Sequence, residues 1–391
     1  MGAGDGLTYS VNYFNHSRGY TFRMESGRVR ESVSDLTWEE RFGLLLVLGV
    51  VVMVLDLVRR LVVGELGTGR FSTFLWRGLV DGLVIGLAAV GLSMTYSILR
   101  FANFSHGDLV TTGAFTGWTV AWVIGGIGTA GLGSRILVNA DRSTSARELD
   151  LHLYGEPIAI VAGLLFAAVA TILVALAIDR LVYRRMRNAG GIPLLIASVG
   201  VALALRYIIV FFYGERTRGV VRSSPVFDHW VIFWTDSVAV HQLVLVVSAV
   251  SLMVGLHLLL QYTKLGKAMR AMADNRDLAL ITGIPTERVI LATWVIGAGL
   301  TGVAGYLIVL EQETLNFNTG WFLLLLIFAA VILGGIGSIY GAIAGGLIIG
   351  LVDNLMLVWI SGDLTRVAAF LLMILILIYR PQGLFGGVET A

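Results

Sequence analysis

Residues Val289–Leu310 read Val-Ile-Leu-Ala-Thr-Trp-Val-Ile-Gly-Ala-Gly-Leu-Thr-Gly-Val-Ala-Gly-Tyr-Leu-Ile-Val-Leu, a stretch without a single charged side chain. A helix that crosses the ~30 Å hydrocarbon core of a bilayer needs about 20 mostly apolar residues. An α-helix also satisfies all its backbone hydrogen bonds internally, which an isolated strand in lipid does not. The stretch therefore predicts a membrane-spanning helix.

The apolar character of this stretch extends over the chain of 391 residues, of which 57% are hydrophobic and 14% charged, with a mean hydropathy of +0.83. Soluble domains average ~45–50% apolar and ~25% charged residues. The chain has no cysteine, which excludes disulfides, thiolate metal sites and cysteine nucleophiles. Its net charge of +2 argues against the concentrated basic face that nucleic-acid binding requires. The composition indicates an integral membrane protein.

The other apolar runs predict an all-α integral membrane protein, a polytopic helical bundle of about nine or ten spans with interrupted helices. The runs are continuous, whereas a membrane β-barrel would alternate polar and apolar residues. Residues 1–40 form a polar N-terminal tail, and residues 41–391 form the transmembrane domain. The expected spans are Gly43–Val63, Leu79–Leu99, Gly107–Ile127, Pro157–Ile178, Ile192–Tyr213, Val238–Leu260, Val289–Leu310, Trp321–Leu333, Gly341–Ile360 and Leu364–Tyr379.

The basic residues of the short loops predict which side of the membrane each loop faces, because cytoplasmic loops are enriched in Lys and Arg. The loop at 179–191 carries four arginines against one acid, and the loop at 261–288 carries two lysines and three arginines. Both loops are expected on the inside. The segment 311–320 has two acids and no base, which suits the outside. For the first hundred residues the arginines leave the topology open.

Ionisable residues within the predicted spans are functional candidates, because charges in the bilayer are rarely retained without a role. We take as candidates Asp56, Asp81, Arg206 and Asp353, together with Arg77 at the start of its span. No ladder of acids or histidines crosses the bilayer. This absence weakens the hypothesis of a carrier driven by protons or sodium ions.

The first informative stretch is Ile98-Leu99-Arg100-Phe101-Ala102-Asn103-Phe104-Ser105-His106-Gly107-Asp108, a polar cluster between two apolar helices. Discontinuous helices place helix ends and free backbone groups at a central pathway. We therefore expect a translocation pathway at Asn103, Ser105, His106, Gly107 and Asp108. The alternative is a capped helix junction without solute contact. No second metal-ligating residue occurs at a residue spacing from His106 that is typical of metal sites, so no metal site is predicted.

The second stretch, Lys264–Pro285, predicts short amphipathic helices on the inner face that end at Gly283 and Pro285. A helix too short to span the membrane, held between two spans, is typical of a docking element. The alternative is a solvated loop on the lipid headgroups.

The third stretch, Leu333–Gly350, is rich in glycine. Small residues spaced by four let helix backbones approach closely in lipid. We expect helix packing by Gly337, Gly341 and Gly345, with the same spacing repeated by Gly346 and Gly350 on an adjacent face, and the alternative is a flexible gate at Gly334–Gly337. The candidate packing or gate residues are Gly334, Gly335, Gly337, Ser338, Gly341 and Gly345.

With these motifs, the sequence resembles the membrane permease subunit of branched-chain amino acid ABC transporters, the leucine/isoleucine/valine uptake type. The family's runs Asn-Phe-Ala-His-Gly-Glu, Gly-Ile-Asn and Leu-Gly-Gly-Ile-Gly-Ser-Ile-Pro-Gly-Ala are similar to residues 103–108, 283–285 and 333–342. The closing run at 380–386 is also similar, and the resemblance covers about 75–388. The departures are Ser105 for Ala, Asp108 for Glu, Pro285 for Asn and Tyr340 for Pro.

The resemblance implies a transport subunit without catalysis of its own. It implies two separate ATPase subunits that bind ATP and magnesium, a second permease or a copy of this chain, an extracellular solute-binding protein, and the cytoplasmic membrane of a prokaryote. It implies no cofactor on this chain. Its coupling helix for the ATPase would be Ala271–Gly283, with the contact oriented by Lys267, Arg270, Asp274 and Asp277.

The residues themselves agree with ATP hydrolysis by separate subunits, because this chain lacks a phosphate-binding loop. Such a loop reads Gly-x4-Gly-Lys-Ser/Thr. Gly266-Lys267 is the only Gly-Lys pair in the sequence; Ala268 follows it and the upstream glycine is missing. The solute stays open between branched-chain amino acids and a related small solute, since related permeases carry urea or short amides. The alternative function is a self-sufficient channel or secondary transporter for a small polar solute. An intramembrane enzyme finds no support, because no His/Asp or Ser/Lys constellation recurs within facing spans.

Overall fold

The computed structural model describes residues 38–125, 157–219, 226–230 and 235–386. Residues 1–37 of the predicted tail and the whole 128–156 loop lie outside the described residues. The chain divides into two compact units, Met1–Glu65 and Leu66–Ala391. In the first unit, helix α1 (Trp38–Val63) holds a local ion cluster in which Asp56 pairs with Arg59 at 3.1 Å and with Arg60 at 2.7 Å. The domain boundary predicted at residue 40 stays a prediction.

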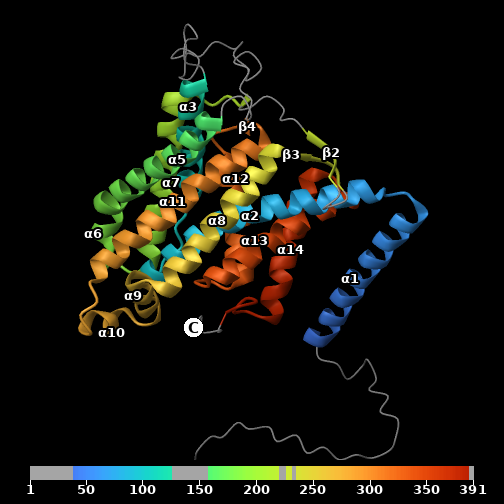
Figure 1. Cartoon of the computed structure of the whole chain (residues 1–391). Coiled ribbons are helices and arrows are strands. Elements are labelled where there is room, and N and C mark those ends of the chain that lie inside the picture. Colours follow the sequence, from blue (N-terminus) through green and yellow to red (C-terminus); the bar gives the residue numbers. More distant parts are fainter. Residues whose placement is uncertain (1–37, 126–156, 220–225, 231–234, 387–391) are drawn as a thin grey trace, which may run out of the picture. The chain divides into compact units, whose positions relative to one another are not determined.

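The second unit is built almost entirely of helices (Figure 1). In chain order they are α2 (Thr68–Leu99), α3 (His106–Gly125), α5 (Pro157–Ile178), the π-helical turn η2 (Asp179–Tyr183), α6 (Arg184–Met186), α7 (Gly191–Tyr213), α8 (Val240–Tyr262), α9 (Lys264–Asp274), α10 (Arg276–Ile281), α11 (Thr286–Gln312), α12 (Thr319–Gly334), α13 (Ile339–Leu355), the 3-10 turn η3 (Met356–Val358) and α14 (Gly362–Tyr379).

Two short antiparallel pairs complete the unit. Strand β1 (Arg218–Gly219) pairs with β4 (Thr314–Leu315) and joins the segments that follow α7 and α11. Strands β2 (Val226–Trp230) and β3 (Thr235–Ala239) form a hairpin before α8. Both pairs lie at helix ends. The charges of the loops predict that these ends face the outer side of the membrane.

The predicted class of a polytopic helical membrane protein is confirmed. Within the described residues, six helices are long and apolar enough to cross a membrane, and α12 and α14 are shorter apolar helices. The predicted interruption after residue 333 is present, because α12 ends at Gly334 and α13 begins only at Ile339. A second interruption separates α2 from α3. The described chain therefore contains full spans and two places where a break of a few residues separates successive helices.

Helices α2 and α11 form the centre of the second unit, since most of their span residues are buried, whereas α5, α7 and α8 expose broad apolar faces. Glycines allow the central contacts. Side chains at Gly346 and Gly350 of α13 would collide with the backbone of α2 around Gly82. Gly302 of α11 meets α5, and Gly305 of α11 meets α3 in the same way. The helices therefore touch backbone to backbone, as small residues permit in lipid.

Candidate functional site

The polar stretch between α2 and α3 turns the chain back into the interior. Arg100 ends α2 in the left-handed conformation, with φ at 57°, and its N–H bonds to Tyr96 O at 2.8 Å. The chain then runs back along α2, so that His106 Nε2 lies 3.0 Å from Ala88 O, eleven residues before the end of that helix. Helix α3 therefore begins inside the protein, where unwound backbone is tolerated only if protein surrounds it.

Asn103 organises this unwound segment. Its Oδ1 accepts hydrogen bonds from Ser105 N (3.1 Å), Ser105 Oγ (2.7 Å) and the Tyr183 hydroxyl (3.2 Å). Tyr183 stacks on Trp294 of α11, with ring centroids 5.2 Å from Phe101 and 5.6 Å from Trp294. Asn103 and Ser105 have no solvent exposure. The Asn103 side chain therefore satisfies one N–H group of the broken backbone, and the Ser105 hydroxyl bonds to Asn103 and lies 2.8 Å from the Tyr183 hydroxyl.

Asp108 fixes the first turn of α3 to two other helices. Both of its carboxylate oxygens accept from Arg206 of α7, at 3.0 Å each, and the Asp108 side chain is completely buried. The Arg206 guanidinium also lies 4.5 Å from the ring of Trp321 in α12. Gly107 packs against Gly320 so closely that neither position has room for a Cβ atom. The five predicted pathway residues are thus brought together, with their side chains engaged in packing and hydrogen bonds.

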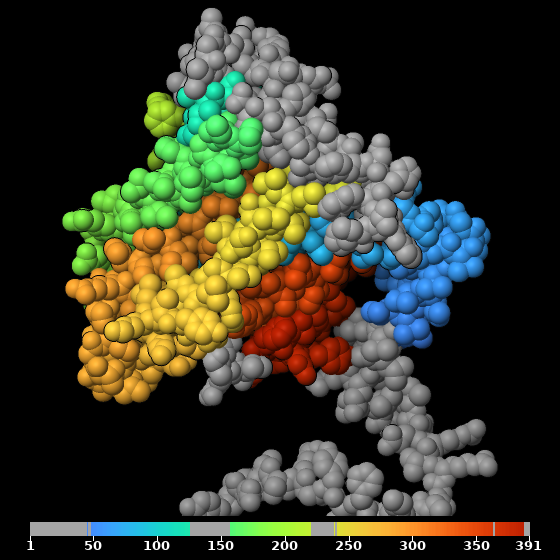
Figure 2. All heavy atoms as spheres, in the orientation of Figure 1, coloured from blue at the N-terminus to red at the C-terminus, as the bar shows by residue number. Residues whose placement is uncertain are grey.

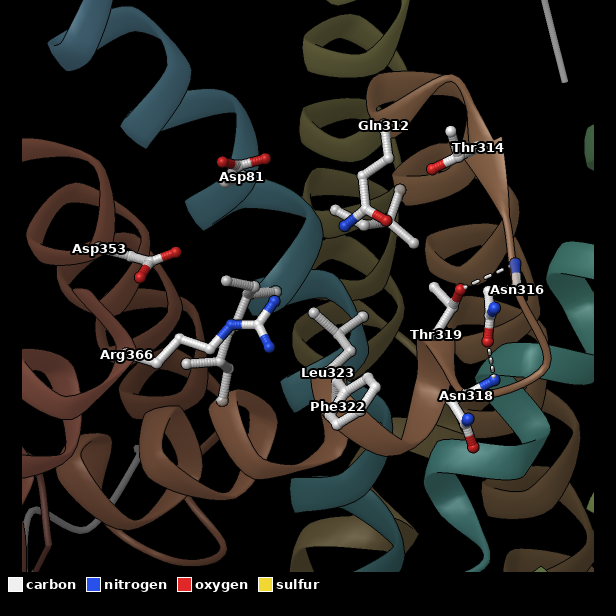
Figure 3. Close-up of a pocket in the computed structure, with 13 residues that line it drawn as sticks. Asp81, Gln312, Thr314, Asn316, Asn318, Thr319, Phe322, Leu323, Asp353 and Arg366 are labelled. Carbon is white, nitrogen blue, oxygen red and sulfur yellow. Dashed lines mark hydrogen bonds between the residues drawn. The ribbon is translucent and has the colours of Figure 1, made fainter. Parts of the chain in front are cut away.

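A cavity of about 320 Å³ lies elsewhere, between the middle of α2 and parts of α11, α12, α13 and α14 (Figure 3). Asp81, Asp353 and Arg366 line one side of it, and polar residues of the 312–319 segment line the other. None of the five predicted pathway residues contributes to its wall. Asp81 and Asp353 were candidates from their place within predicted spans. Arg366 was missed, although it is the only base in the last predicted span.

On the opposite side lie α9 and α10, the short helices that the sequence predicted, which together form a segment called the hairpin below. Thr263 Oγ1 caps α9 by accepting from Gly266 N at 3.0 Å, and Asn275 Oδ1 caps α10 by accepting from Leu278 N at 2.9 Å. After α10 the chain turns at Gly283, whose φ of 83° favours glycine. Met269 and Met272 anchor the hairpin because both are buried against the helices.

Helix α10 exposes three large aliphatic side chains. Leu278 is 54% exposed, Leu280 59% and Ile281 80%. Figure 2 shows the gold atoms of α9 and α10 at the surface, uncovered by other coloured atoms in that view. Three aliphatic side chains on a six-residue helix beyond the end of the spans form a patch of the kind that marks an interaction surface.

The charged residues predicted for this surface divide into two groups. Lys267, Asp274 and Asp277 are exposed, and so is the turn at Gly283. Ala271 is half-buried. Arg270 points inward instead, where it donates to Gln261 Oε1 at 3.3 Å and lines a small cavity of about 60 Å³ between the hairpin and α13.

The glycine-rich stretch forms a tight inner turn between α12 and α13. A Cβ atom on Gly334 or Gly341 would collide with the backbone of the other residue, and Gly345 meets Ala330 in the same way. Ser338 Oγ caps α13 by accepting from Gly341 N at 3.0 Å. Gly335 and Gly337 have positive φ values of 106° and 89°. This geometry is one of close packing around a sharp turn.

The C-terminal motif closes this turn. Leu384 N donates to Leu333 O at 2.8 Å, and Phe385 N donates to Gly334 O at 3.0 Å. Gly383 lies directly against Gly335. Two motifs that are far apart in sequence therefore form one structural unit, in which the C-terminal turn satisfies carbonyl groups left open at the end of α12.

Comparison with protein families gives a match to the model described as branched-chain amino acid transport system / permease component, over residues 74–377. The chain belongs to this family. The matched region contains the polar α2–α3 junction, the α9–α10 hairpin and the α12–α13 turn.

Among relatives of this permease is the high-affinity branched-chain amino acid transport system permease protein LivH of Escherichia coli K12, which is 30% identical over 82% of this chain and 97% of LivH. BraD of Pseudomonas aeruginosa, with the same description, is 27% identical over 80% of this chain and 96% of BraD. A probable branched-chain amino acid transport permease protein LivH of Methanocaldococcus jannaschii is 29% identical over 77% of this chain and 88% of its own length. No solved structure matches.

The permease differs from the expected family motif at Tyr340, which stands in place of proline at the start of α13. The Tyr340 hydroxyl lies 2.7 Å from His257 Nδ1 and accepts from Gln261 Nε2 at 3.3 Å. His257 and Gln261 belong to α8, and Gln261 also receives the bond from Arg270 of α9. This polar chain connects the hairpin with the α12–α13 turn. From the sequence, Tyr340 could be recognised only as a departure from the family motif. No sequence pattern indicated its hydrogen-bond partners.

Proposed function

We propose that this chain is the transmembrane permease subunit of an ATP-driven ABC importer that carries branched-chain amino acids inward. Its membership of the permease family supports the proposal. The structural observation that carries it is the α9–α10 hairpin, which presents Leu278, Leu280 and Ile281 beyond the ends of the spans. An apolar patch on a short, anchored helix suits docking into a groove of another protein.

The partners follow from the resemblance. Two ATPase subunits would bind the inner hairpins of this chain and of a second permease, which is either a homologue or a copy. A solute-binding protein would deliver the amino acid from outside. The assembly would lie in the cytoplasmic membrane of a prokaryote. ATP and magnesium would bind to the ATPase subunits, because the sequence of this chain has no phosphate-binding loop, and the chain would act without catalysis of its own.

The contacts of the hairpin give motion a route into the membrane part. Arg100, at the inner end of α2, donates to Ala273 O of α9. Arg270 donates to Gln261, which in turn donates to Tyr340 at the start of α13. When an ATPase moves the hairpin, these bonds would pull on α2 and on the α12–α13 turn together. Because packed interfaces hold discrete arrangements, such a displacement would switch the bundle between two states.

The test is co-purification followed by transport. The tagged permease is expressed together with the ATPase and the solute-binding protein that are encoded by neighbouring genes. It should retain the ATPase during purification in mild detergent. Vesicles that contain the complex should accumulate leucine when ATP is present. Uptake should stop when the phosphate-binding lysine of the ATPase is replaced. Accumulation of a solute, whether leucine, urea or an amide, by vesicles that contain this chain alone would overturn the proposal in favour of a self-sufficient transporter.

A further inference from the structure

The outer cavity brings together charges of both signs from three helices. Asp81 comes from α2, Asp353 from the outer end of α13 and Arg366 from the first turns of α14 (Figure 3). The volume of about 320 Å³ lies at the lower end of the range for pockets that hold small molecules. Charged side chains inside spans are retained mainly where they serve a pathway or a ligand. The cavity therefore has the size and the chemistry of a binding site.

The three charges keep bonding capacity that the described residues do not use. Asp81 accepts one hydrogen bond, from Asn354 Nδ2 at 2.9 Å, and Asp353 accepts one, from Thr365 Oγ1 at 2.6 Å. Each carboxylate thus has a second oxygen without a partner among the described residues. The Arg366 guanidinium lies 5.8 Å from the Phe322 ring and makes no ion pair with either acid in the described part of the chain.

The rest of the wall is mixed in a way that suits an amphipathic solute. Ile85 and Ile308 face the cavity from α2 and α11, and Leu323 and Leu326 face it from α12. An aliphatic group placed against them would be removed from water. Amide and hydroxyl groups of the 312–319 segment line the remaining side.

We infer that this cavity binds a free α-amino acid with an aliphatic side chain, as the first membrane subsite on its way inward; the inference rests on the proposed import function. Arg366 binds the α-carboxylate, because a guanidinium matches a carboxylate with two parallel hydrogen bonds. Asp81 and Asp353 accept from the α-ammonium group. The aliphatic side chain packs against Ile85, Ile308 and the leucines of α12.

A zwitterion fits this cavity better than the other solutes that the family context allows. Urea or a short amide is neutral and would leave two carboxylates and a guanidinium without counter-charges. An inorganic cation would satisfy the acids and leave Arg366 and the apolar wall without a role. A solute that carries both charges on one carbon and a hydrocarbon branch uses every part of the wall.

The natural lack of cysteine allows a direct test. Asn318→Cys places a thiol on the cavity wall, at a side chain with no hydrogen bond to any other described residue, and Glu215→Cys places one on an exposed position after α7 as a control. The permease–ATPase complex without its solute-binding protein is put into nanodiscs and treated with a membrane-impermeant methanethiosulfonate. Labelling of this chain is then read by its mass at increasing concentrations of leucine, isopentylamine, 4-methylpentanoate and urea.

Leucine should protect the thiol of the Asn318→Cys variant and leave that of the Glu215→Cys variant reactive. Isopentylamine lacks the carboxylate and 4-methylpentanoate lacks the ammonium group, so each should need on the order of ten- to a hundredfold higher concentration, the effect of one charge-assisted contact. In an Arg366→Gln background, leucine protection should weaken by the same factor while isopentylamine protection is unchanged. Arg366→Lys should be intermediate, and Arg216→Gln, an exposed outer arginine, should behave as the parent.

The outcomes separate this inference from the proposed function. If the complex imports leucine with ATP and no solute protects the thiol, or if urea protects as well as leucine, the cavity assignment is wrong and the import function stands. If Arg366→Gln weakens leucine and isopentylamine equally, the arginine has a structural role and the assignment of the carboxylate to it fails. If leucine protects the thiol and ATP-driven import is absent, the proposed function fails and the cavity is no import subsite, while its binding of the amino acid stands.

Discussion

The α9–α10 hairpin and the α2–α3 junction both interrupt the long helices, but they differ in solvent exposure and in hydrogen bonding. The junction is buried: Asn103, Ser105 and Asp108 have no exposure, and their oxygens are bound to neighbouring helices. The hairpin ends in exposed aliphatic side chains, of which Ile281 is 80% exposed. The comparison indicates that the junction holds the bundle together, whereas the hairpin exposes the surface that we propose for a partner.

The largest expected effect in this comparison is at the buried ion pair of the junction. Arg206→Ala should destabilise the protein by about 3–5 kcal/mol, because it leaves the completely buried Asp108 carboxylate without a counter-charge. The measurement is the thermal unfolding temperature in detergent. The double variant Asp108→Leu/Arg206→Met should recover most of the loss, since an apolar pair replaces the ion pair. A double variant as unstable as the single one would contradict this assignment.

The next effect is at the glycine contacts of the spans. Gly345→Ala should cost about 1–3 kcal/mol, because its methyl group would meet the backbone of Ala330 in α12. Gly200→Ala in α7 is the matched control, since nothing lies within 4 Å of its added Cβ atom. The control should be neutral or slightly stabilising, as Ala favours helix more than Gly does. Equal unfolding temperatures for the two variants would show that α12 and α13 do not pack as closely as described.

A smaller effect is expected at the apolar patch of the hairpin, and it should appear in binding rather than in stability. Leu278→Ser and Ile281→Ser should each weaken ATPase binding by about 2 kcal/mol, near thirtyfold, if both side chains are central to the interface. Unfolding should change by no more than about 0.5 kcal/mol, because both residues are exposed. Lys264→Ser, an exposed change in the same hairpin, is the control. Unaltered affinity in both patch variants would remove the docking role from α10.

The smallest effect is at the turn after the hairpin. Gly283→Val should cost about 1–2 kcal/mol through its left-handed backbone, with φ at 83°, since no atom lies within 4 Å of an added Cβ. Uptake per ATP hydrolysed should fall, while membrane insertion is normal. Gly283→Asn should retain coupling, because asparagine tolerates this conformation. If uptake per ATP hydrolysed were the same in the Val and Asn variants, coupling would not depend on the left-handed backbone at Gly283.

Local patterns in the sequence predicted the features that local physics determines. Continuous apolar runs indicated the spans, the glycines after residue 333 indicated the broken helix, and the composition of Lys264–Pro285 indicated short inner helices. The polar run at Asn103 and Ser105 indicated a break between two helices, where these two residues are hydrogen-bonded to each other. Their predicted part in solute translocation stays a prediction.

These local sequence patterns could not predict contacts between segments that are distant in the sequence. Asp108 and Arg206 are 98 residues apart, and nothing near either residue indicates the other. The outer cavity depends on how α2, α13 and α14 pack, which glycine contacts around Gly82 and Gly346 determine. Asp81 and Asp353 could be recognised one by one, but their common cavity with Arg366 follows only from the fold.

The central claim is that an external ATPase drives this chain through its inner hairpin. The most direct measurement follows leucine accumulation and ATP hydrolysis together in vesicles that hold the complete transporter, with the parent chain and with Leu278→Ser/Ile281→Ser. The account predicts ATP-dependent accumulation for the parent and a loss of accumulation for the variant, which should still fold and insert. Full accumulation by the variant, or accumulation that continues without ATP hydrolysis, would contradict it.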